Sequence, residues 1–502
     1  PRTILGATSI AHTIQDQAKL KLAYDISPTL TASYTLGLWQ GDNTTDVASY
    51  LRDAAGNPVY NGKVNFGGKQ YTIKDTDLNP GSSEQQHWMH GLSLASRTGS
   101  TWDWEALASV YDYSRDLSRA PTTALPGAAA AGGGPGTLTD MSGTGWRTLD
   151  LRGTWRPNPA HETNFGYHFD HYQLETEVSK TAKWSSGSAV SRTSAFVGKT
   201  ETQALYAQDA WRFAPDWKAT LGGRWENWQA FDGAVSDPTH TLGFGKRNET
   251  FFSPKLALSF QPALAWALRA SLAQAYRMPS VAELYQGRIS NNAIVKNDPN
   301  LKPEQALSGE LTAERELSNG LLRVTYFQEN ARDALYSQTL LGSSPSVTTI
   351  QNIDGIRTRG LELAYQGVDI GWRGLDLTGS ITYADSIITQ NDADPATVGN
   401  RQPRVPNWRA AVSATYHQNA QLSYALAARY SGQQFNTLGN SDSNHDTYGG
   451  VSKFFVLDVR LRYKLDRQWS AAMGIDNLTN QQYYVAHPYP LRTLSAELKY
   501  DF

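Results

Sequence analysis

The sequence predicts an all-β fold, a transmembrane antiparallel β-barrel that has 22 strands when complete, with about nineteen of them in these 502 residues. Three observations predict it. Apolar and polar residues alternate with a period of two in segment after segment. The connections between these segments alternate between short and long, and tryptophan residues crowd the segment ends. A soluble β-sandwich has no reason to sort its loops by length.

Each alternating segment is interpreted as one strand. In 454–465, for example, Leu457 and Val459 alternate with Asp458 and Arg460, which gives the strand one apolar and one polar face. The predicted strands are, in order, 18–25, 30–40, 84–97, 102–115, 146–156, 162–179, 200–213, 217–230, 251–260, 266–277, 304–317, 320–335, 351–366, 375–388, 408–417, 422–434, 454–465, 469–480 and 492–502.

The connections divide into two classes. Short ones include 26–29, 98–101 and 214–216, and long ones include 41–83 and 278–303. Bacterial outer-membrane barrels have short periplasmic turns and long extracellular loops. We predict the tryptophans beside the short turns to form an interfacial girdle, the alternative being that tryptophan simply favours strands. They are Trp102, Trp104, Trp155, Trp211, Trp217, Trp266, Trp408 and Trp469.

The last strand, 492–502, runs from a long loop toward the short-turn side, and so does the first. A closed barrel with both ends in the periplasm needs an even strand number. An odd number of strands is therefore expected before Pro1, and three would bring the total to 22, the size of barrels with a plugged lumen. The face expected toward lipid carries Leu494, Leu498, Tyr500 and Phe502, and the face expected toward the lumen carries Glu497, Lys499 and Asp501.

Composition excludes several classes of protein. The formal charge of -2, from 45 basic and 47 acidic residues, gives no nucleic-acid footprint. Cysteine is absent, so disulfides and thiolate metal sites are impossible. The mean hydropathy of -0.49 and the lack of any long apolar run exclude a helical membrane protein. With 15 Trp, 25 Tyr and 42 Gly, the composition leans toward a barrel.

Several motifs resemble those of TonB-dependent outer-membrane receptors, particularly the siderophore receptors. They are "AYRMPSVAELY" (275–285), "NDPNLKPEQALSGELTAE" (297–314), "NIDGIRTRGLELAY" (352–365) and the terminal "GIDNLTNQQYY" (474–484) with "LSAELKYDF" (494–502). They occur in family-like order and spacing over roughly 250–502. The first half resembles the family in architecture only.

The resemblance implies a 22-stranded barrel with an N-terminal plug inside it, in the outer membrane of a Gram-negative bacterium. It implies active import of a scarce metal chelate, most often a ferric siderophore, with energy from the TonB complex. Haem, cobalamin or a copper complex is the alternative ligand. No plug and no TonB box lie within 1–502, so both are expected upstream of a barrel domain that fills 1–502. A passive porin-like channel and an adhesin or phage receptor are the other functions considered.

The candidate ligand residues lie at the long-loop end. Tyr483, Tyr484, His487 and Tyr489 are grouped in "QQYYVAHPYP", where their rings can stack on a catecholate or heterocyclic ligand. The alternative is that they belong to an aromatic belt at the outer leaflet.

Arg277 and Tyr285 flank the loop 278–303, and Arg401 lies with Arg404 in another long loop. Arginine suits an anionic ferric complex. The alternatives for each arginine are a solvated loop or a contact with lipopolysaccharide phosphate.

No resident metal, cofactor or catalytic site is predicted. His87 and His90 in "HWMH" differ by three positions and therefore point to opposite faces of an extended strand, which disfavours a copper site. No phosphate-binding loop, G-x-S-x-G or H-E-x-x-H motif occurs, so an enzyme is not expected. Phe502 resembles the terminal aromatic signal that the barrel-assembly machinery reads, and outer-membrane lipid is the expected surroundings.

Overall fold

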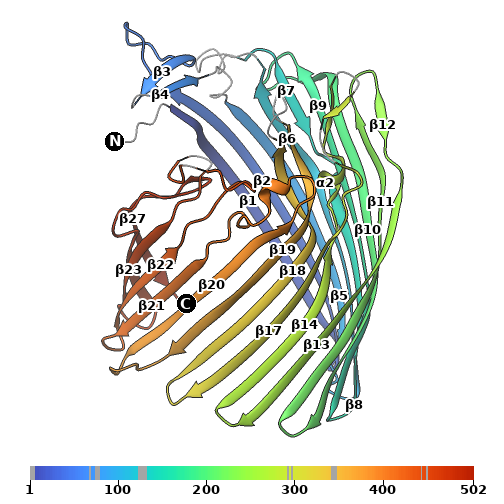
Figure 1. The fold of residues 1–502 in the computed structure, drawn as a ribbon, viewed down its shortest axis with the longest axis vertical. Coiled ribbons are helices and arrows are strands. Elements are labelled where there is room, and N and C mark those ends of the chain that lie inside the picture. The colour runs from blue at the N-terminus through green and yellow to red at the C-terminus, as the bar shows by residue number, and fades with distance from the viewer. Residues whose placement is uncertain are drawn as a thin grey trace.

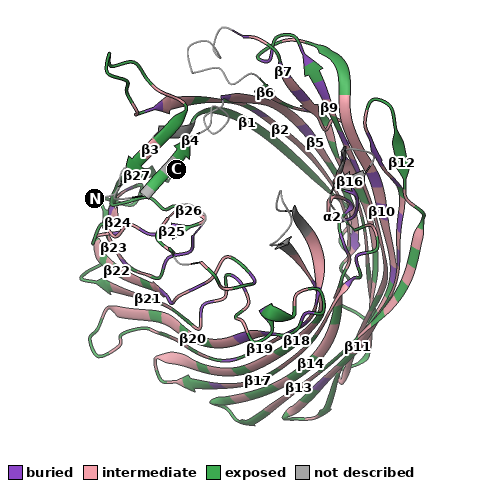
Figure 2. Cartoon of the chain, turned by 45° about the horizontal axis from the view of Figure 1, so that its top comes forward, coloured by how far each residue is buried: buried purple, intermediate pink, exposed green. Residues whose placement is uncertain are grey.

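The computed structural model describes residues 6–66, 69–73, 80–122, 133–290, 293–295, 298–340, 347–442, 444–447 and 450–501. Its main feature is one 21-stranded sheet that curls around a wide interior (Figures 1 and 2). Two of these strands, β7 and β12, are short and lie at the long-loop end, and the other nineteen form the barrel wall. Within the described residues no ladder joins β1 to β27, so these two strands are the edges of the sheet.

The wall strands are β1 (Gly6–Ser27), β2 (Leu30–Ser49), β5 (Gly81–Ser96), β6 (Trp102–Pro121), β8 (Gly145–Asn158), β9 (His161–Thr181), β10 (Ala189–Ala214), β11 (Trp217–Ser236), β13 (Arg247–Ala263), β14 (Trp266–Arg277), β17 (Glu304–Leu317), β18 (Gly320–Leu340), β19 (Val347–Gly367), β20 (Leu375–Gln390), β21 (Trp408–His417), β22 (Leu422–Ser431), β23 (Phe454–Lys464), β24 (Trp469–Asp476) and β27 (Thr493–Tyr500). The smaller elements are β3 (Gly62–Phe66), β4 (Lys69–Ile73), β7 (Gly136–Asp140), β12 (Thr241–Gly243), β15 (Arg288–Ser290), β16 (Ala293–Val295), β25 (Tyr484–Val485), β26 (His487–Pro488), the helix α2 (Val281–Tyr285) and the 3₁₀ helix η2 (Pro395–Thr397).

Each predicted strand corresponds to one wall strand, and every ladder between neighbours is antiparallel, so the predicted fold class is confirmed. Several predicted strands were too short at the long-loop end, whereas β22 and β24 end three and four residues before the predicted 434 and 480. β1 begins twelve residues before position 18, and β10 begins eleven before position 200. The alternation of apolar and polar residues marks only the part of a strand that faces lipid, because the outer face is polar beyond that band.

The two faces of the wall have opposite character, as predicted. On β17, Leu311 is 59% exposed on the outer face, whereas its neighbour Glu310 points inward. On β27, Leu494 and Leu498 are outward and strongly exposed, and Tyr500 packs its ring 4.8 Å from that of Trp469. Phe502 lies outside the described residues. Over the described part of the chain, no helix combines the length and hydropathy needed to cross a membrane.

Charged side chains of the inner face pair across neighbouring strands. The Glu314 carboxylate of β17 forms ion pairs with Arg269 of β14 and Arg323 of β18. A guanidinium nitrogen of each arginine lies 2.8 Å from Glu314 Oε1. Arg429 of β22 lies 3.1 Å from Asp458 of β23. These ladders of ion pairs confirm the expected polar lumen wall, and they hold neighbouring strands in register.

All short turns lie at one end of the barrel and all long loops at the other (Figure 1). The wall is of unequal height, because β1 to β13 are mostly 16 to 26 residues long and β21 to β27 only 8 to 11. The prediction that Trp408 belongs to the girdle beside the short turns was wrong. Trp408 begins β21 at the long-loop end, and its ring centroid lies 4.9 Å from that of Tyr383. It follows a long loop rather than a short turn.

A charge on the lipid-facing side of β17 should destabilise the barrel. We expect Leu311→Lys to lower the free energy of unfolding in lipid vesicles by about 2–4 kcal/mol, as for a lysine at mid-bilayer. Glu310→Lys, one residue away on the lumen face, is the matched control and should change it by much less. Equal losses in the two variants, measured by urea titration, would contradict the assigned faces.

Candidate functional site

The long loops fold into the mouth of the barrel, where Figure 2 shows α2, β25 and β26 inside the ring of strands. The loop 278–303 carries the helix α2. Ser280 caps it by accepting from the N–H of Glu283, and the Glu283 carboxylate accepts from the N–H of Ser280. Arg277, at the end of β14, lies 3.2 Å from Glu283 and 3.8 Å from Glu304. The predicted ligand residue Arg277 therefore fixes the base of this loop.

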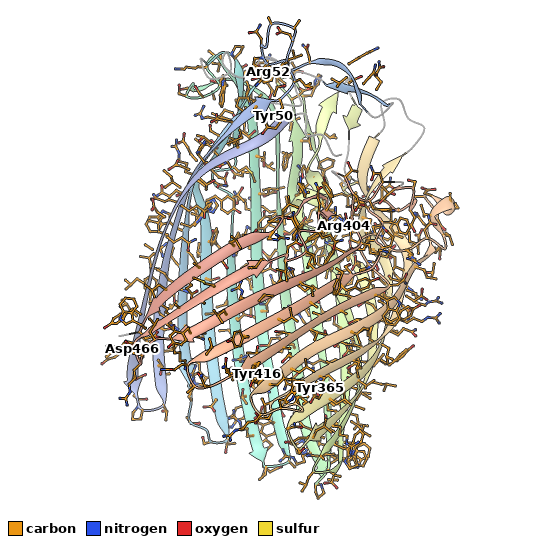
Figure 3. The ribbon with its side chains drawn as sticks, turned by 90° about the vertical axis from the view of Figure 1, so that its left-hand side faces the viewer. Tyr50, Arg52, Tyr365, Arg404, Tyr416 and Asp466 are labelled. Carbon is orange, nitrogen blue, oxygen red and sulfur yellow. The ribbon has the colours of Figure 1, made fainter. Side chains whose placement is uncertain are left out.

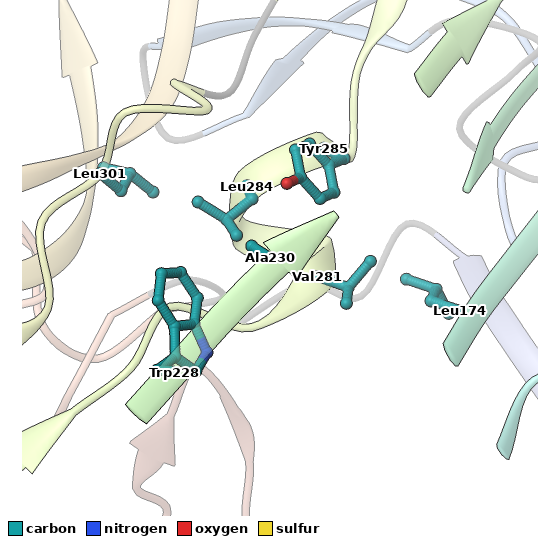
Figure 4. Close-up of a cluster of buried hydrophobic side chains, with 7 residues drawn as sticks. All are labelled: Leu174, Trp228, Ala230, Val281, Leu284, Tyr285 and Leu301. Carbon is teal, nitrogen blue, oxygen red and sulfur yellow. The ribbon is translucent and has the colours of Figure 1, made fainter. Parts of the chain in front are cut away.

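The helix is anchored to the inner wall by a buried apolar cluster (Figure 4). Tyr285 is 1% exposed and stacks 5.3 Å from Phe244. Its ring covers Gly198 of β10 and Gly233, where an added Cβ would come within 2.5 and 2.4 Å of it. Two glycines thus leave the space that the ring fills. The cluster comprises Leu174, Trp228, Ala230, Val281, Leu284, Tyr285 and Leu301.

Arg247 fastens the second arm of the same loop. Its guanidinium donates to the carbonyl oxygens of Pro299 at 2.7 Å and Leu301 at 2.9 Å. It also lies 5.2 Å above the ring of Trp228, a cation–π contact. Burial raises the pKa of the Tyr285 hydroxyl. The sequence suggested Tyr285 as a ligand residue; the structure gives it an anchoring contact, and ligand contact stays a prediction.

A second apolar cluster lies on the inner face of β18 to β20, under the loop 391–407 and the segment that follows β22. Its buried members are Ala334, Ile353, Ile356, Ile388 and Leu438. Beside it, Gln402 donates to the Tyr336 hydroxyl at 2.6 Å and accepts from Ser386. These contacts hold the loop 391–407 against the wall.

The two arginines of the loop 391–407 are both exposed but differ in their hydrogen bonds. Arg401 has an exposed side chain, and Asn440 exchanges two hydrogen bonds with its backbone at 2.8 and 2.9 Å. Arg404 has a φ of 63° and donates from Nε to Asn436 at 2.9 Å. Figure 3 shows Arg404 at the long-loop end of the low part of the wall, with Tyr50 and Arg52 farther out along the barrel. Arg401 is thus presented to solvent at the mouth.

The tyrosine group near the C-terminus has both buried and exposed members. Tyr483 is 4% exposed, packs 4.5 Å from Phe454 and 4.9 Å from Tyr489, and burial raises its pKa. Tyr484 is 7% exposed, and its backbone exchanges hydrogen bonds with Ser452. His487 and Tyr489 are exposed. Tyr489 and His487 are thus the solvent-exposed members of the group, and ligand contact by the four residues stays a prediction.

Sequence reasoning missed an inner row of rings that His87 joins. We define the aromatic row as Trp39 of β2, His87 of β5, Tyr111 and Tyr113 of β6, Trp146 of β8 and Tyr172 of β9. His87 stacks on Tyr113 at 3.8 Å and 11°, and Tyr111 stacks on Trp146 at 4.2 Å and 2°. Trp39 lies 5.0 Å from His87, and Tyr172 lies 6.5 Å from Trp146. The sequence does contain a signal for this row, because its aromatic residues lie at similar numbers of residues from the short turns of neighbouring strands.

His87 and His90 point to opposite faces, as predicted from their spacing. His87 is buried and lies 3.2 Å from the Asp116 carboxylate, whereas His90 is exposed and bonds to the Tyr34 hydroxyl at 2.8 Å. Among the described residues, no group of three or more His, Asp or Glu is placed to hold a metal ion. The chemistry that the mouth offers is stacking, hydrogen bonding and charge.

A family model described as "TonB dependent receptor-like, beta-barrel" matches residues 21–478. The chain is 23% identical over 302 residues to the probable TonB-dependent siderophore receptor PiuA of Acinetobacter baumannii, a match that spans 58% of this chain and 38% of that protein. It is similar in fold to the unliganded ferric citrate transporter FecA, with a TM-score of 0.72 and 17% identity over 98% of this chain and 70% of that one. The copper transporter OprC gives a TM-score of 0.71 and 16% identity, over 98% and 72%.

Tyr285 should hold the loop 278–303 against the wall. Tyr285→Ala leaves a cavity beside Gly198 and Gly233, and large-to-small changes of this kind cost about 3–5 kcal/mol. We expect faster amide exchange and faster proteolytic cleavage within 278–303, with the barrel still folded. Tyr489→Ala, in another loop, is the control and should leave cleavage of 278–303 unchanged. An unaltered cleavage rate in Tyr285→Ala would show that the ring is not the anchor.

Proposed function

Because this chain belongs to the family of TonB dependent receptor-like β-barrels, we propose that it is the barrel of a receptor that imports a metal chelate, most specifically a ferric siderophore. It is an outer-membrane protein of a Gram-negative bacterium, and its family comprises receptors and not enzymes. The observation that carries the proposal is the mouth itself. Loops fixed on the inner wall frame stacking rings and the exposed cation of Arg401, which suits a large anionic chelate.

The mechanism is binding and movement rather than bond-making. The chelate is captured at the long-loop mouth, and a plug inside the barrel is then rearranged by the TonB complex so that the chelate passes to the periplasm. The likeness to a probable siderophore receptor supports this ligand class. Lipopolysaccharide at the outer rim and the barrel-assembly machinery are the further partners that we propose.

We propose that the remaining strands, the plug and the TonB-contacting segment precede this chain in the full protein. The chain spans 38% and 46% of the lengths of two curated relatives that it matches. Within the described residues β1 has a ladder on one side only, which leaves the other edge open for an upstream strand. Three strands between β1 and β27 would complete 22.

Growth tests the ligand class. We expect iron starvation to induce the receptor, and deletion of its gene to abolish growth on one ferric siderophore as sole iron source. Restoring the full-length gene should restore that growth. Loss of growth on cobalamin, haem or a copper chelate instead would contradict the siderophore assignment. Unregulated leakage of small solutes through the full-length protein would support a passive channel.

We propose that Phe502 is read during membrane assembly. Deleting Phe502 should lower the amount of folded receptor in the outer membrane, because the terminal aromatic is lost, while each assembled molecule keeps its ligand affinity. The measurement is heat-modifiable mobility of the receptor on gels together with a binding titration. Phe502→Tyr keeps an aromatic terminus and is the matched control. Unchanged assembly after the deletion would refute this role.

A further inference from the structure

One carboxylate interrupts the apolar outer face of the high wall, where β9, β10 and β11 lie side by side (Figure 1). Asp209 of β10 has the same parity as Leu205 and Trp211, whose side chains point outward and are 57% and 42% exposed. Its ladder partners, Thr163 of β9 and Leu221 of β11, share that face. Asp209 is therefore an outward residue, and it is the only acidic one at the outward positions of β10 between Leu205 and the short turn.

Two residues of β9 hold the Asp209 carboxylate. His161 Nδ1 lies 2.7 Å from Oδ2, and the Thr163 hydroxyl donates to Oδ1 at 2.9 Å. The imidazole also stacks on Trp211, with ring centroids 5.7 Å apart and ring planes 10° apart. The side chains of His161 and Asp209 nevertheless remain 34% and 30% exposed. The carboxylate–imidazole pair is thus fixed in geometry and open to a molecule that approaches from outside the barrel.

The pair presents a negative charge and hydrogen-bond acceptors. An imidazole that donates from Nδ1 to a carboxylate keeps Nε2 as an acceptor, and among the described residues His161 Nε2 has no hydrogen-bond partner. No third His, Asp or Glu in the described part of the chain joins the pair to hold a metal ion. The site therefore fits an organic cation with N–H donors. The residues that adjoin Asp209 on the outer face are uncharged, namely Thr163, Ala207, Trp211 and Leu221.

The depth of the pair in the membrane is that of lipid headgroups. Trp211 and Trp155 lie beside short turns, where tryptophans of such barrels mark the membrane–water interface. Trp155 pairs with Thr163, the ladder partner of Asp209. At ~3.3 Å per residue and a strand tilt of ~40°, Asp209 lies ~5 Å deeper in the membrane than Trp211. A headgroup that reaches the carboxylate therefore keeps its acyl chains in the hydrocarbon region.

An apolar groove of about 810 Å³ begins directly above the pair. Ala207, the next outward residue of β10, lines it together with its ladder partners Phe165 and Gly223. The Phe165 ring covers Gly153 and the Phe252 ring covers Gly223, where an added Cβ would come within 2.5 and 2.7 Å of these rings. A groove of this character at this depth fits a lipid acyl chain. Its other apolar lining residues include Trp102, Trp104, Leu151, Leu205 and Trp225.

We propose that this surface binds a phospholipid of the periplasmic leaflet whose headgroup carries a primary ammonium group. The ammonium donates to the Asp209 carboxylate and to His161 Nε2, and one acyl chain lies in the groove above Ala207. A trimethylammonium headgroup has no N–H to donate, and the carboxylate repels an anionic headgroup. The site therefore selects phosphatidylethanolamine over phosphatidylcholine and phosphatidylglycerol. The inference depends on the outer-membrane location of this chain and not on the ligand that it imports.

Titration of the full-length receptor in detergent with each of these three phospholipids, followed by native mass spectrometry, tests the selectivity. We expect the wild type to bind phosphatidylethanolamine most tightly. Asp209→Asn keeps the size of the side chain and removes its charge, so it should weaken phosphatidylethanolamine binding roughly three- to tenfold, to the level of phosphatidylcholine. Glu162→Gln is the matched control, because it removes an acid from the lumen face of β9 beside His161, and it should leave all three affinities unchanged.

Ala207→Phe obstructs the groove and leaves the pair in place, so it should weaken binding of phosphatidylethanolamine as well. Equal affinities of the wild type for the three lipids, or an unchanged preference in Asp209→Asn, would overturn the proposal. Undiminished binding in Ala207→Phe would overturn it too, because no acyl chain would then lie in the groove. If Asp209→Asn does not fold, judged by heat-modifiable mobility, His161→Phe removes Nε2, keeps a ring and carries the same expectation. A wild-type dimer that excludes lipid would assign the groove to a second copy of the chain and refute lipid binding.

Discussion

Every stretch of backbone that faces lipid must find its hydrogen bonds within the protein, because hydrocarbon offers no partner for an N–H or C=O group. The 21-stranded sheet meets this constraint with antiparallel ladders between successive wall strands. Side-chain direction follows from the ladder, since register fixes which residues face outward. Leu311 on the outside and Glu314 on the inside are consequences of the same pairing. The lumen wall that carries the aromatic row therefore depends on the backbone ladder.

Glycine is the second requirement of this wall, because a sheet that carries loops on its inner face needs hollows. Gly198 and Gly233 accept the ring of Tyr285, and Gly41 accepts that of Trp39. At Gly198 and Gly233 a Cβ would clash with the Tyr285 ring, and at Gly41 it would crowd the Trp39 ring. The contact of the Tyr285 ring with Gly198 and Gly233 offsets part of the conformational entropy that is lost when the loop 278–303 is ordered. The barrel mouth is thus shaped by small residues of the wall as much as by its loops.

The sequence allowed the fold to be predicted almost strand by strand, because the period of two and the parity of the connections both follow from membrane geometry. It could not predict how far β1 and β10 rise, since above the apolar band the outer face is polar and the alternation disappears. Of the candidate site, Arg401, His487 and Tyr489 are exposed, and their contact with a ligand stays a prediction. Tyr285 was predicted as a ligand residue, but its burial could not be predicted, because that burial depends on glycines far away in the sequence. His87 was considered only as a metal ligand, because its ring neighbours come from two other strands, β2 and β6.

Affinity at such a mouth depends on how much order is present before the ligand arrives. The clusters around Tyr285 and Ile388 dock the loops, and the His87–Asp116 pair holds the rings of β6, so little side-chain entropy remains to be lost on that side. The low wall at β21 to β27 is covered instead by loops that carry the exposed Arg401 and His487. One side of the interior therefore carries rings packed against one another, and the other side is a polar, solvent-exposed margin. Under the import function that we propose, the charged margin would supply the long-range attraction of an anionic ligand toward the mouth.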